Sequence, residues 1–287
     1  MQAGSLRYEV TLPPPRRVRQ NIMTTETKQP TGECLRIRVH GEADQPTLIY
    51  LPGLHGDWTL VPSFRIAMGD LVRFVEFTYP RTLDWSLEDY ADNVGRMLVA
   101  NGIVSGWVIA ESFGSQVAWP LVAERSGGFR AEGLILAGGF GRHPLGSLVH
   151  LGGRFCSGVP LGMVTRALFW YEQLSKFRFR NAPAAREGLK EFIARRTELD
   201  KQAGAARLRL IADNHPEKLA ARISVPVFYL TGFWDPIVPW PPVMGWLRRN
   251  CSTYRGARII GTADHTVLVT GVRKAARYVS EWMSLTR

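Results

Sequence analysis

The sequence is poor in cysteine and has no long apolar run. Its three cysteines among 287 residues, Cys34, Cys156 and Cys251, are widely spaced and form no C-x-x-C pair. An odd number at such spacings argues against a disulfide framework or a zinc knuckle and indicates a reducing compartment. No apolar stretch approaches the roughly 18 residues of a transmembrane helix, and the N-terminus lacks the apolar segment of a signal peptide. We therefore expect a cytoplasmic protein without membrane association.

Motifs for metal or nucleotide chemistry are also missing. The chain has no H-E-x-x-H pair and no Cys/His cluster, so we expect no metal ion. It has no Walker-type phosphate loop, and the stretch 137–144 carries Pro144 where the third glycine of a dinucleotide fingerprint belongs. We expect the protein to work without a cofactor.

Acidic residues are scarce relative to basic ones. There are 25 Asp and Glu against 36 Lys and Arg, which gives a formal net charge of +11. Most of the excess falls between residues 141 and 222. The run 176–180 alternates basic and aromatic residues, as some nucleic-acid-binding segments do, but it lies inside that same interval. We interpret the charge as a solvated basic face and expect no nucleic-acid partner.

What the sequence does contain is a regular alternation of short apolar runs and helical patterns. The helical patterns include residues 86–102, where Ser86 is placed to cap the N-terminus, and residues 272–285. Strands separated by helices indicate an α/β protein with a mainly parallel sheet, in which ligands bind at the carboxyl ends of the strands. The strand candidates are residues 34–39, 47–51, 72–80, 106–110, 133–139, 225–232 and 257–261.

The spacing of these patterns divides the chain into three parts. Residues 1–30, with a run of prolines followed by basic residues, are interpreted as an N-terminal arm over the surface or a tail. Residues 31–140 and 223–287 carry the strands and form the core. The interval 141–222 is too long for a single connection and contains helical patterns, so we expect it to form a helical cap inserted before the last two strands.

Ser112 lies where an apolar strand gives way to a helical pattern. In a nucleophile elbow, the serine occupies a strained turn, and the residues two before and two after it are small because strand and helix approach closely. Ala110 and Gly114 meet this requirement. A serine N-cap of an ordinary helix is the alternative, and a suitably placed base and acid would favour the elbow.

A serine nucleophile needs a base, and the base needs an acid that orients it. Among the six histidines, His265 alone follows the last strand candidate, and Asp235 follows the strand candidate before it. We therefore predict Ser112, Asp235 and His265 as the catalytic residues. Asp213 is the alternative acid, but it precedes a strand. Asp264 adjoins His265, and its side chain is expected to point elsewhere.

Together, these stretches resemble the α/β-hydrolase superfamily over roughly residues 35–285. The resemblance implies the α/β-hydrolase fold with a helical cap, and the activity of a serine hydrolase. It rests on four stretches, which are Pro-Gly-Leu-His-Gly at 52–56, Ala-Glu-Ser-Phe-Gly at 110–114, Gly-Phe-Trp-Asp at 232–235 and Asp-His at 264–265.

Matching the same stretches implies an oxyanion hole formed by the backbone N–H groups of Leu54 and Phe113. Two positions depart from the common pattern of the superfamily. Ala110 replaces the first glycine of the elbow, and Asp264 stands where a glycine often precedes the histidine. Alanine is a small residue that the first of these positions tolerates.

Aromatic and apolar residues are frequent in the expected cap and on the loops at the active edge, and packing between cap and core accounts for most of them. Because a cap must also roof the site, we expect some of them to line an apolar pocket. Such a pocket suits an acyl chain or an aromatic acid better than a peptide or a sugar. The candidates are Trp58, Phe140, Phe155, Met163, Phe169, Trp170, Phe233 and Trp234.

The sequence thus predicts a carboxylic-ester hydrolase that acts through an acyl-enzyme on a small-molecule ester or thioester. A thioesterase, lactonase, acyltransferase or carbon–carbon bond hydrolase would use the same residues. A ligand-binding receptor on this scaffold is the alternative outside enzymes, and a peripheral lipase, with the basic cap meeting anionic lipid, is a third reading. The oligomeric state is not predicted.

Overall fold

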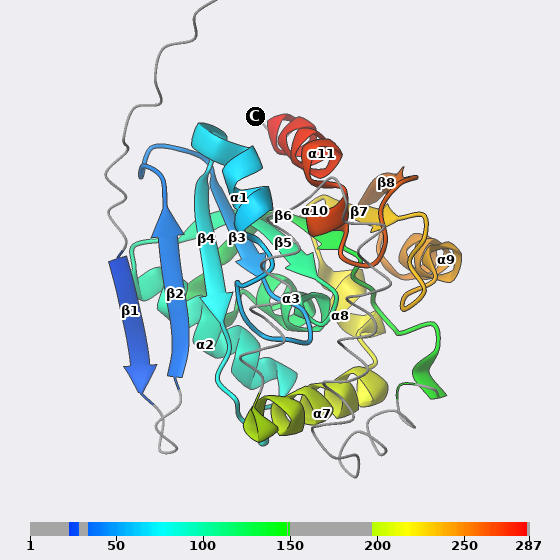
Figure 1. Cartoon of the computed structure of the whole chain (residues 1–287), viewed down its shortest axis with the longest axis horizontal. Helices are drawn as coiled ribbons and strands as arrows, with labels where there is room; N and C mark the ends of the chain where they lie inside the picture. Colours follow the sequence, from blue (N-terminus) through cyan, green and yellow to red (C-terminus); the bar gives the residue numbers. More distant parts are fainter. Residues whose placement is uncertain (1–22, 29–33, 148, 150–196, 286–287) are drawn as a thin grey trace, which may run out of the picture.

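An eight-stranded sheet forms the centre of the molecule in the computed structural model, which describes residues 23–28, 34–147, 149 and 197–285 (Figure 1). The strand order is β1-β2-β4-β3-β5-β6-β7-β8; β1 and β2 run antiparallel to their neighbours, and all other pairs are parallel. The strands are β1 (Met23–Lys28), β2 (Cys34–His40), β3 (Thr47–Leu51), β4 (Arg73–Thr78), β5 (Ser105–Glu111), β6 (Arg130–Ala137), β7 (Val227–Gly232) and β8 (Tyr254–Ile260).

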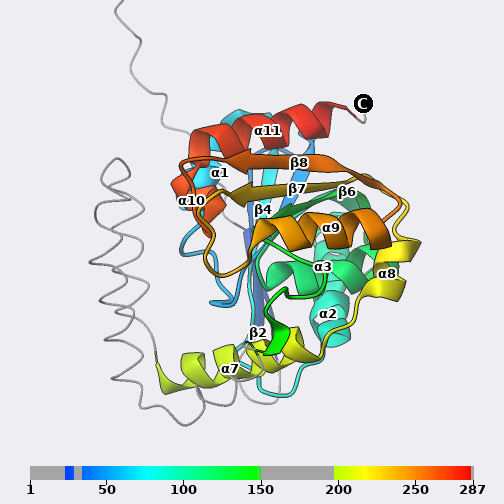
Figure 2. The ribbon, with the colours of Figure 1, turned by 90° about the vertical axis from the view of Figure 1, so that its right-hand side faces the viewer.

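Helices cover both faces of the sheet (Figure 2). Helices α1, α10 and α11 pack on one face, and α2, α3, α8 and α9 pack on the other. The helices are α1 (Pro62–Met68), α2 (Leu87–Ala100), α3 (Gly114–Ala123), α7 (Glu198–Asp213), α8 (Glu217–Arg222), α9 (Trp240–Asn250), α10 (Val267–Thr270) and α11 (Val272–Ser284), with the 3-10 helices η1 (Gly69–Leu71) and η2 (Ser126–Gly128).

Most residues of the central strands are apolar because helices bury both faces of the sheet there. In β3, Leu48 and Tyr50 belong to the core under α1 and α11, whereas Ile49 and Leu51 belong to the core under α2 and α3. Alternation of this kind anchors the strand in one register, since a shift by one residue would exchange the two sets.

Local signals in the sequence place several helix ends. Ser86 caps α2 as expected: its hydroxyl accepts a hydrogen bond from the Asp89 N–H, and the Asp89 carboxylate accepts one from the Ser86 N–H. Pro120 lies inside α3, where no backbone N–H is available, and the helix ends three residues later at Ala123.

The structure adds one element to the expected arrangement and leaves another partly undescribed. The end of the expected N-terminal arm forms β1, which pairs with β2 at the edge of the sheet. Most of the expected cap, residues 150–196, lies outside the described residues, while α7 and α8 come from its last part. In the described ranges, no helix has the length and apolar character needed to cross a membrane.

Candidate active site

Ser112 sits in a sharp turn between β5 and α3. Its backbone φ is +48°, in a region that non-glycine residues rarely occupy. The start of α3 lies very close to the end of β3. A Cβ atom added to Gly114 would lie only 2.4 Å from the carbonyl oxygen of Leu51. Ala110, two residues before the serine, is fully buried. These are the steric demands that led to the elbow prediction.

The structure brings together the three residues predicted from the sequence. His265 Nε2 lies 2.9 Å from Ser112 Oγ, and His265 Nδ1 lies 2.8 Å from Asp235 Oδ2. Both the acid and the histidine are at least nine-tenths buried. The imidazole thus bridges the hydroxyl and the carboxylate by two hydrogen bonds.

The loops that carry the acid and the histidine are joined by their backbones. The N–H of Phe233 donates to the carbonyl of Ile260 at 3.0 Å, and the N–H of Trp234 donates to the carbonyl of Ala263 at 3.1 Å. These contacts follow from the parallel pairing of β7 with β8, which ends both strands at the same edge. The separation between acid and base is therefore set by the sheet.

Backbone donors orient the Asp235 carboxylate. Its Oδ1 accepts hydrogen bonds from the N–H groups of Ile237 at 2.9 Å and Val238 at 2.8 Å, which directs Oδ2 to the histidine. The two other acids considered from the sequence point elsewhere. Asp264 accepts hydrogen bonds from Thr266, which precedes α10, and from Thr270 at the end of α10. Asp213 is exposed at the end of α7.

The charge around His265 favours its protonated form. Burial alone would lower the pKa of the imidazole, but the hydrogen bond and the charge of Asp235 outweigh burial and raise this pKa above its ordinary value. Glu111 and Asp264 add smaller contributions in the same direction. The site is thus built to stabilise an imidazolium between the hydroxyl and the carboxylate.

Glu111, directly before Ser112, is buried and contacts the wall of the site. It accepts a hydrogen bond from the hydroxyl of Tyr50. Burial, followed by the charge of Glu111, raises the pKa of Tyr50 well above its ordinary value, so the hydroxyl keeps its proton and donates. Glu111 thus supports the end of β5 through its contact with Tyr50, and it also contributes to raising the pKa of His265.

The two N–H groups predicted for the oxyanion hole belong to the loops beside Ser112. Within the described ranges, neither the N–H of Leu54 nor that of Phe113 donates a hydrogen bond to the protein. The side chain of Phe113 packs into the core against Tyr79 and Tyr90, so it turns away from the site. Both donors remain available to an oxygen atom bound near Ser112.

A buried arginine from α7 holds the loop that contains Leu54. The Arg207 guanidinium donates to the carbonyl of Leu54 at 2.9 Å and to the carbonyl of Pro80 at 3.0 Å. It also lies 5.7 Å from the ring centroid of Tyr79. No carboxylate in the described part of the chain pairs with it. Arg207 therefore connects the helix above the site to the loop beneath it.

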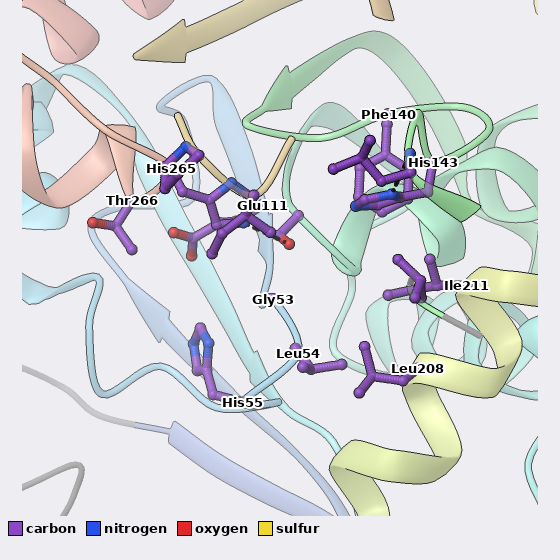
Figure 3. A pocket seen from close by; sticks show the side chains of 15 residues that line it. Gly53, Leu54, His55, Glu111, Phe140, His143, Leu208, Ile211, His265 and Thr266 are labelled. Atoms are coloured by element: carbon purple, nitrogen blue, oxygen red, sulfur yellow. Dashed lines mark hydrogen bonds between the residues drawn. The ribbon is translucent and has the colours of Figure 1, made fainter. Parts of the chain in front are cut away.

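A cavity of about 430 Å³ opens beside Ser112 and His265 (Figure 3). Its walls come from the loops after β3, β5, β6, β7 and β8 and from α7, and most of the lining side chains are apolar. The lining residues are Gly53, Leu54, His55, Glu111, Ser112, Phe140, His143, Leu145, Val149, Leu208, Ile211, Pro236, Ile237, His265 and Thr266.

The predicted lining residues are distributed differently from the expectation. Phe140 lines the cavity, but Trp58, Phe233 and Trp234 do not, which corrects the prediction. Trp58 packs against the core on the α1 and α11 side of the sheet, and the Arg38 guanidinium lies 3.9 Å from its ring centroid. Phe233 and Trp234 contact each other edge to face, with ring centroids 5.1 Å apart, and both side chains are about half exposed. The remaining candidates, Phe155, Met163, Phe169 and Trp170, lie outside the described residues.

Sequence reasoning missed several residues of the cavity wall. Leu208 and Ile211 lie on one face of α7, and their spacing of three residues was the available signal for that face. Pro236 and Ile237 directly follow the predicted acid. The sequence did not predict a place for His143 in the cavity wall, because nothing in its neighbours distinguishes a cavity residue from a surface residue.

The described residues contain no cluster of three or more His, Cys, Asp or Glu side chains that would hold a metal ion.

Comparison with known proteins gives a match in structure but not in sequence. No model of a protein family and no curated protein matches the sequence. Among solved structures, a hydrolase from Pseudomonas aeruginosa has a TM-score of 0.73 at 15% identity, covering 91% of this chain and 98% of its own. An esterase from a Rhodococcus species has a TM-score of 0.71 at 15% identity, covering 92% and 98%. An enol-lactonase from Burkholderia xenovorans has a TM-score of 0.70 at 16% identity, covering 88% and 97%.

Proposed function

We propose that this chain, which has the α/β-hydrolase fold, is a serine hydrolase that cleaves carboxylic esters of small molecules through an acyl-enzyme. The observation that carries the proposal is the continuous hydrogen-bonded line from Ser112 through His265 to Asp235, of which Ser112 and His265 line the cavity. A structural serine has no need of an imidazole and a buried carboxylate in this order.

In the first half of the proposed reaction, Ser112 Oγ attacks the ester carbonyl carbon and passes its proton to His265 Nε2. Asp235 stays ionised and holds the Nδ1–H of the resulting imidazolium. The N–H groups of Leu54 and Phe113 stabilise the negative oxygen of the tetrahedral intermediate, a role worth about 3–4 kcal/mol per donor in hydrolases of this kind. The carbon–oxygen bond then breaks, and His265 returns the proton to the departing alcohol.

In the second half, water attacks the acyl group on Ser112. His265 accepts a proton from the water and then gives it to Ser112 Oγ as the acid leaves. The mainly apolar cavity walls favour a short or medium aliphatic acyl chain or an aromatic group, since they offer few polar partners to a sugar or a peptide. We further propose that the segment 141–222 acts as the cap of this site. Its described residues in the cavity wall are His143, Leu145, Val149, Leu208 and Ile211.

The related activities differ in the leaving group and in the acceptor. A thioesterase or lactonase would use the same residues on a thioester or a cyclic ester, and an acyltransferase would replace water with an alcohol. A panel of p-nitrophenyl esters, thioesters and lactones, assayed with and without added alcohol, separates these activities. A receptor-like protein would be acylated once at Ser112 by such an ester and would show no steady turnover.

The experiment that tests the proposal compares the wild type with Ser112→Ala on a short p-nitrophenyl ester. Loss of the nucleophile should lower kcat by several orders of magnitude, while the thermal unfolding temperature stays near that of the wild type. Ser105→Ala, at the opposite end of the same strand, serves as the control and should keep full activity. Near wild-type turnover by Ser112→Ala would refute the assignment.

A further inference from the structure

The loop after β6, residues 138–143, is fixed against α3 by buried hydrogen bonds. The carbonyl of Phe140 accepts hydrogen bonds from Ser115 Oγ at 3.0 Å, Gln116 Nε2 at 2.9 Å and Trp119 Nε1 at 3.0 Å. The N–H of Phe140 donates to Ser115 Oγ at 3.0 Å. A loop held in this way presents its later residues to the cavity in one arrangement.

His143 is one of those residues, and its tautomer follows from a hydrogen bond. The backbone N–H of Leu145 donates to His143 Nδ1 at 3.1 Å, so Nδ1 carries no proton and the proton of the neutral ring is on Nε2. The ring meets Phe140 edge to face, with centroids 4.8 Å apart. These two contacts set the direction of the Nε2–H bond.

The ring of His143 stays neutral in the working range of pH. Burial is the main cause that lowers its pKa to about 4, and the charge on His265 acts in the same direction, while Asp235 opposes it. The side chain is 8% exposed and lies in the wall of the cavity that holds Ser112 and His265. In Figure 3, His143 faces the side of the cavity on which Glu111 and His265 lie.

The Nε2–H of His143 has no acceptor among the residues that the structure describes. The neighbouring parts of the cavity wall are apolar and include Phe140, Leu145 and Ile211. His143 Nε2 is not among the buried side-chain atoms that lack a partner, so it is accessible to solvent in the cavity wall. A fixed, neutral donor in this position can donate its hydrogen bond to an oxygen atom of a bound ligand in place of water.

We propose that His143 is a specificity-determining residue whose Nε2–H binds a second oxygen of the substrate, apart from the ester that is cleaved. The inference rests on the proposed ester hydrolase activity and narrows its substrate class. The preferred esters carry an ether, keto or hydroxyl oxygen in the acyl or alcohol part, and purely aliphatic esters of the same shape are poorer substrates. Sites built to hydrogen-bond such a group discriminate against analogues that lack it.

The test uses pairs of esters that differ by one oxygen in place of one methylene. The acyl series consists of p-nitrophenyl alkoxyalkanoates and their alkanoate counterparts, with the oxygen moved along the chain. The alcohol series consists of alkoxyalkyl and alkyl butyrates, assayed by acid release. For each pair, kcat/KM of the oxygenated ester is divided by that of the aliphatic ester, and comparing this selectivity ratio between variants removes the intrinsic difference in reactivity.

Two variants separate the two nitrogen atoms of His143. In His143→Asn, the amide oxygen can replace Nδ1 as acceptor for Leu145, but no donor reaches the position of Nε2. In His143→Gln, the longer side chain brings an amide N–H to that position and gives up the Nδ1 acceptor. His215→Asn, at an exposed histidine after α7, is the control. Thermal unfolding checks that each variant is folded.

We expect the selectivity ratio at the best oxygen position to fall roughly 3- to 10-fold in His143→Asn, the value of one hydrogen bond. His143→Gln should retain most of the ratio, and the control should keep all of it. An unchanged ratio in His143→Asn at every oxygen position, or an equal loss in both His143 variants, would overturn the inference while ester hydrolysis stands. Absence of turnover by the wild type on both series would instead overturn the proposed function, and this inference with it.

Discussion

At the level of single residues, the protonation of His265 governs the expected activity. The imidazole must be neutral to accept the proton of Ser112, and the structure raises its pKa through Asp235, with Glu111 in support. Activity therefore falls as the pH drops through this raised pKa, because the protonated imidazole cannot act as a base. The acidic limb of the kcat/KM profile should have its midpoint above the value of about 6.5 that is usual for histidine.

Replacing Glu111 by glutamine tests this electrostatic account. Glu111→Gln removes a buried negative charge but keeps an oxygen that can accept the hydrogen bond from Tyr50. Since Glu111 contributes to raising the pKa of His265, its loss lowers that pKa. The acidic limb of the kcat/KM profile should consequently move to lower pH.

Glu132→Gln, at an exposed position of β6, is the matched control and should leave the profile unchanged. An acidic limb that stays in place in Glu111→Gln, or that moves to higher pH, would contradict the role given to Glu111.

Ser112, Asp235 and His265 were predictable from the sequence because each stands beside a strong local signal. Each follows a strand of the parallel sheet, and the serine is flanked by small residues. The directions of Phe233 and Trp234 were not predictable in the same way. A loop aromatic can point into the cavity or along the rim, and the pairing between neighbouring loops decides which.

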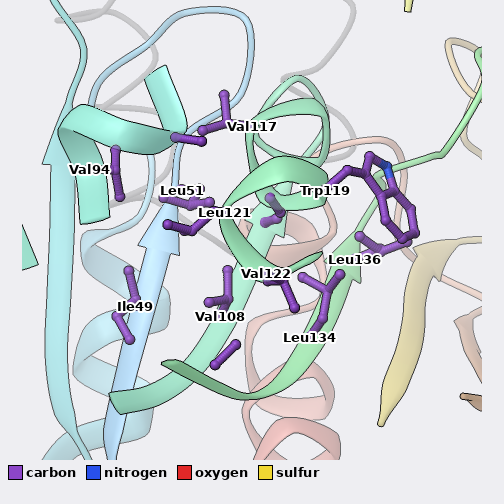
Figure 4. Packing of buried hydrophobic residues seen from close by; sticks show 14 of the residues in the cluster. Ile49, Leu51, Val94, Val108, Val117, Trp119, Leu121, Val122, Leu134 and Leu136 are labelled. Atoms are coloured by element: carbon purple, nitrogen blue, oxygen red, sulfur yellow. The ribbon is translucent and has the colours of Figure 1, made fainter. Parts of the chain in front are cut away.

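At the level of elements, the packing of α3 on the sheet positions the serine. Figure 4 shows Val117, Leu121 and Val122 of α3 over Ile49, Leu51 and other residues of the central strands. This contact holds the helix against β3. At position 114 the two backbones are so close that only glycine fits. The serine turn is thus held from both sides, which is how its unusual φ persists.

Helix α7 has a second role, since Arg207 connects it to the loop that carries Leu54. Replacing Arg207 by methionine leaves the carbonyls of Leu54 and Pro80 without this donor, although it also removes a buried charge. We expect Arg207→Met to lower the free energy of unfolding by about 2–4 kcal/mol. We also expect kcat to fall by a larger factor than KM rises, because the Leu54 N–H is less well placed for the transition state.

Arg209→Met, on the same helix but exposed, provides the comparison and should change neither quantity. Urea unfolding and steady-state kinetics measure the two effects. Equal stability and equal kcat in Arg207→Met and the wild type would show that the contact does not hold the loop.

The strands and the cores of the helices were predictable because their apolar patterns are local. The predicted strand 47–51 matches β3, and the helix predicted over 272–285 matches α11 to within one residue. The contact of α7 with the core was not predictable, because in the sequence a buried arginine resembles any other basic residue of an amphipathic helix. Strand β1 was missed for a related reason, since its polar sequence has no apolar alternation.

At the level of the whole molecule, the sheet unites residues that are far apart in the chain. Ser112 and His265 are separated by 153 positions, yet they form a hydrogen bond because the parallel strands before them end at one edge. The same fold occurs in proteins that are about 15% identical to this chain. Such identity suffices for the fold, since the burial pattern of strands and helices tolerates many substitutions, whereas the substrate depends on a few side chains of the cavity.

The most direct test of the account is the mass of the tryptic peptide that contains Ser112, measured after the enzyme is quenched during turnover of a slowly deacylated p-nitrophenyl ester. The account predicts a peptide heavier by one acyl group, with the added mass on Ser112, in the same amount as an initial burst of p-nitrophenol. Steady turnover with an unmodified Ser112 peptide, or with the acyl group on another residue, would contradict it.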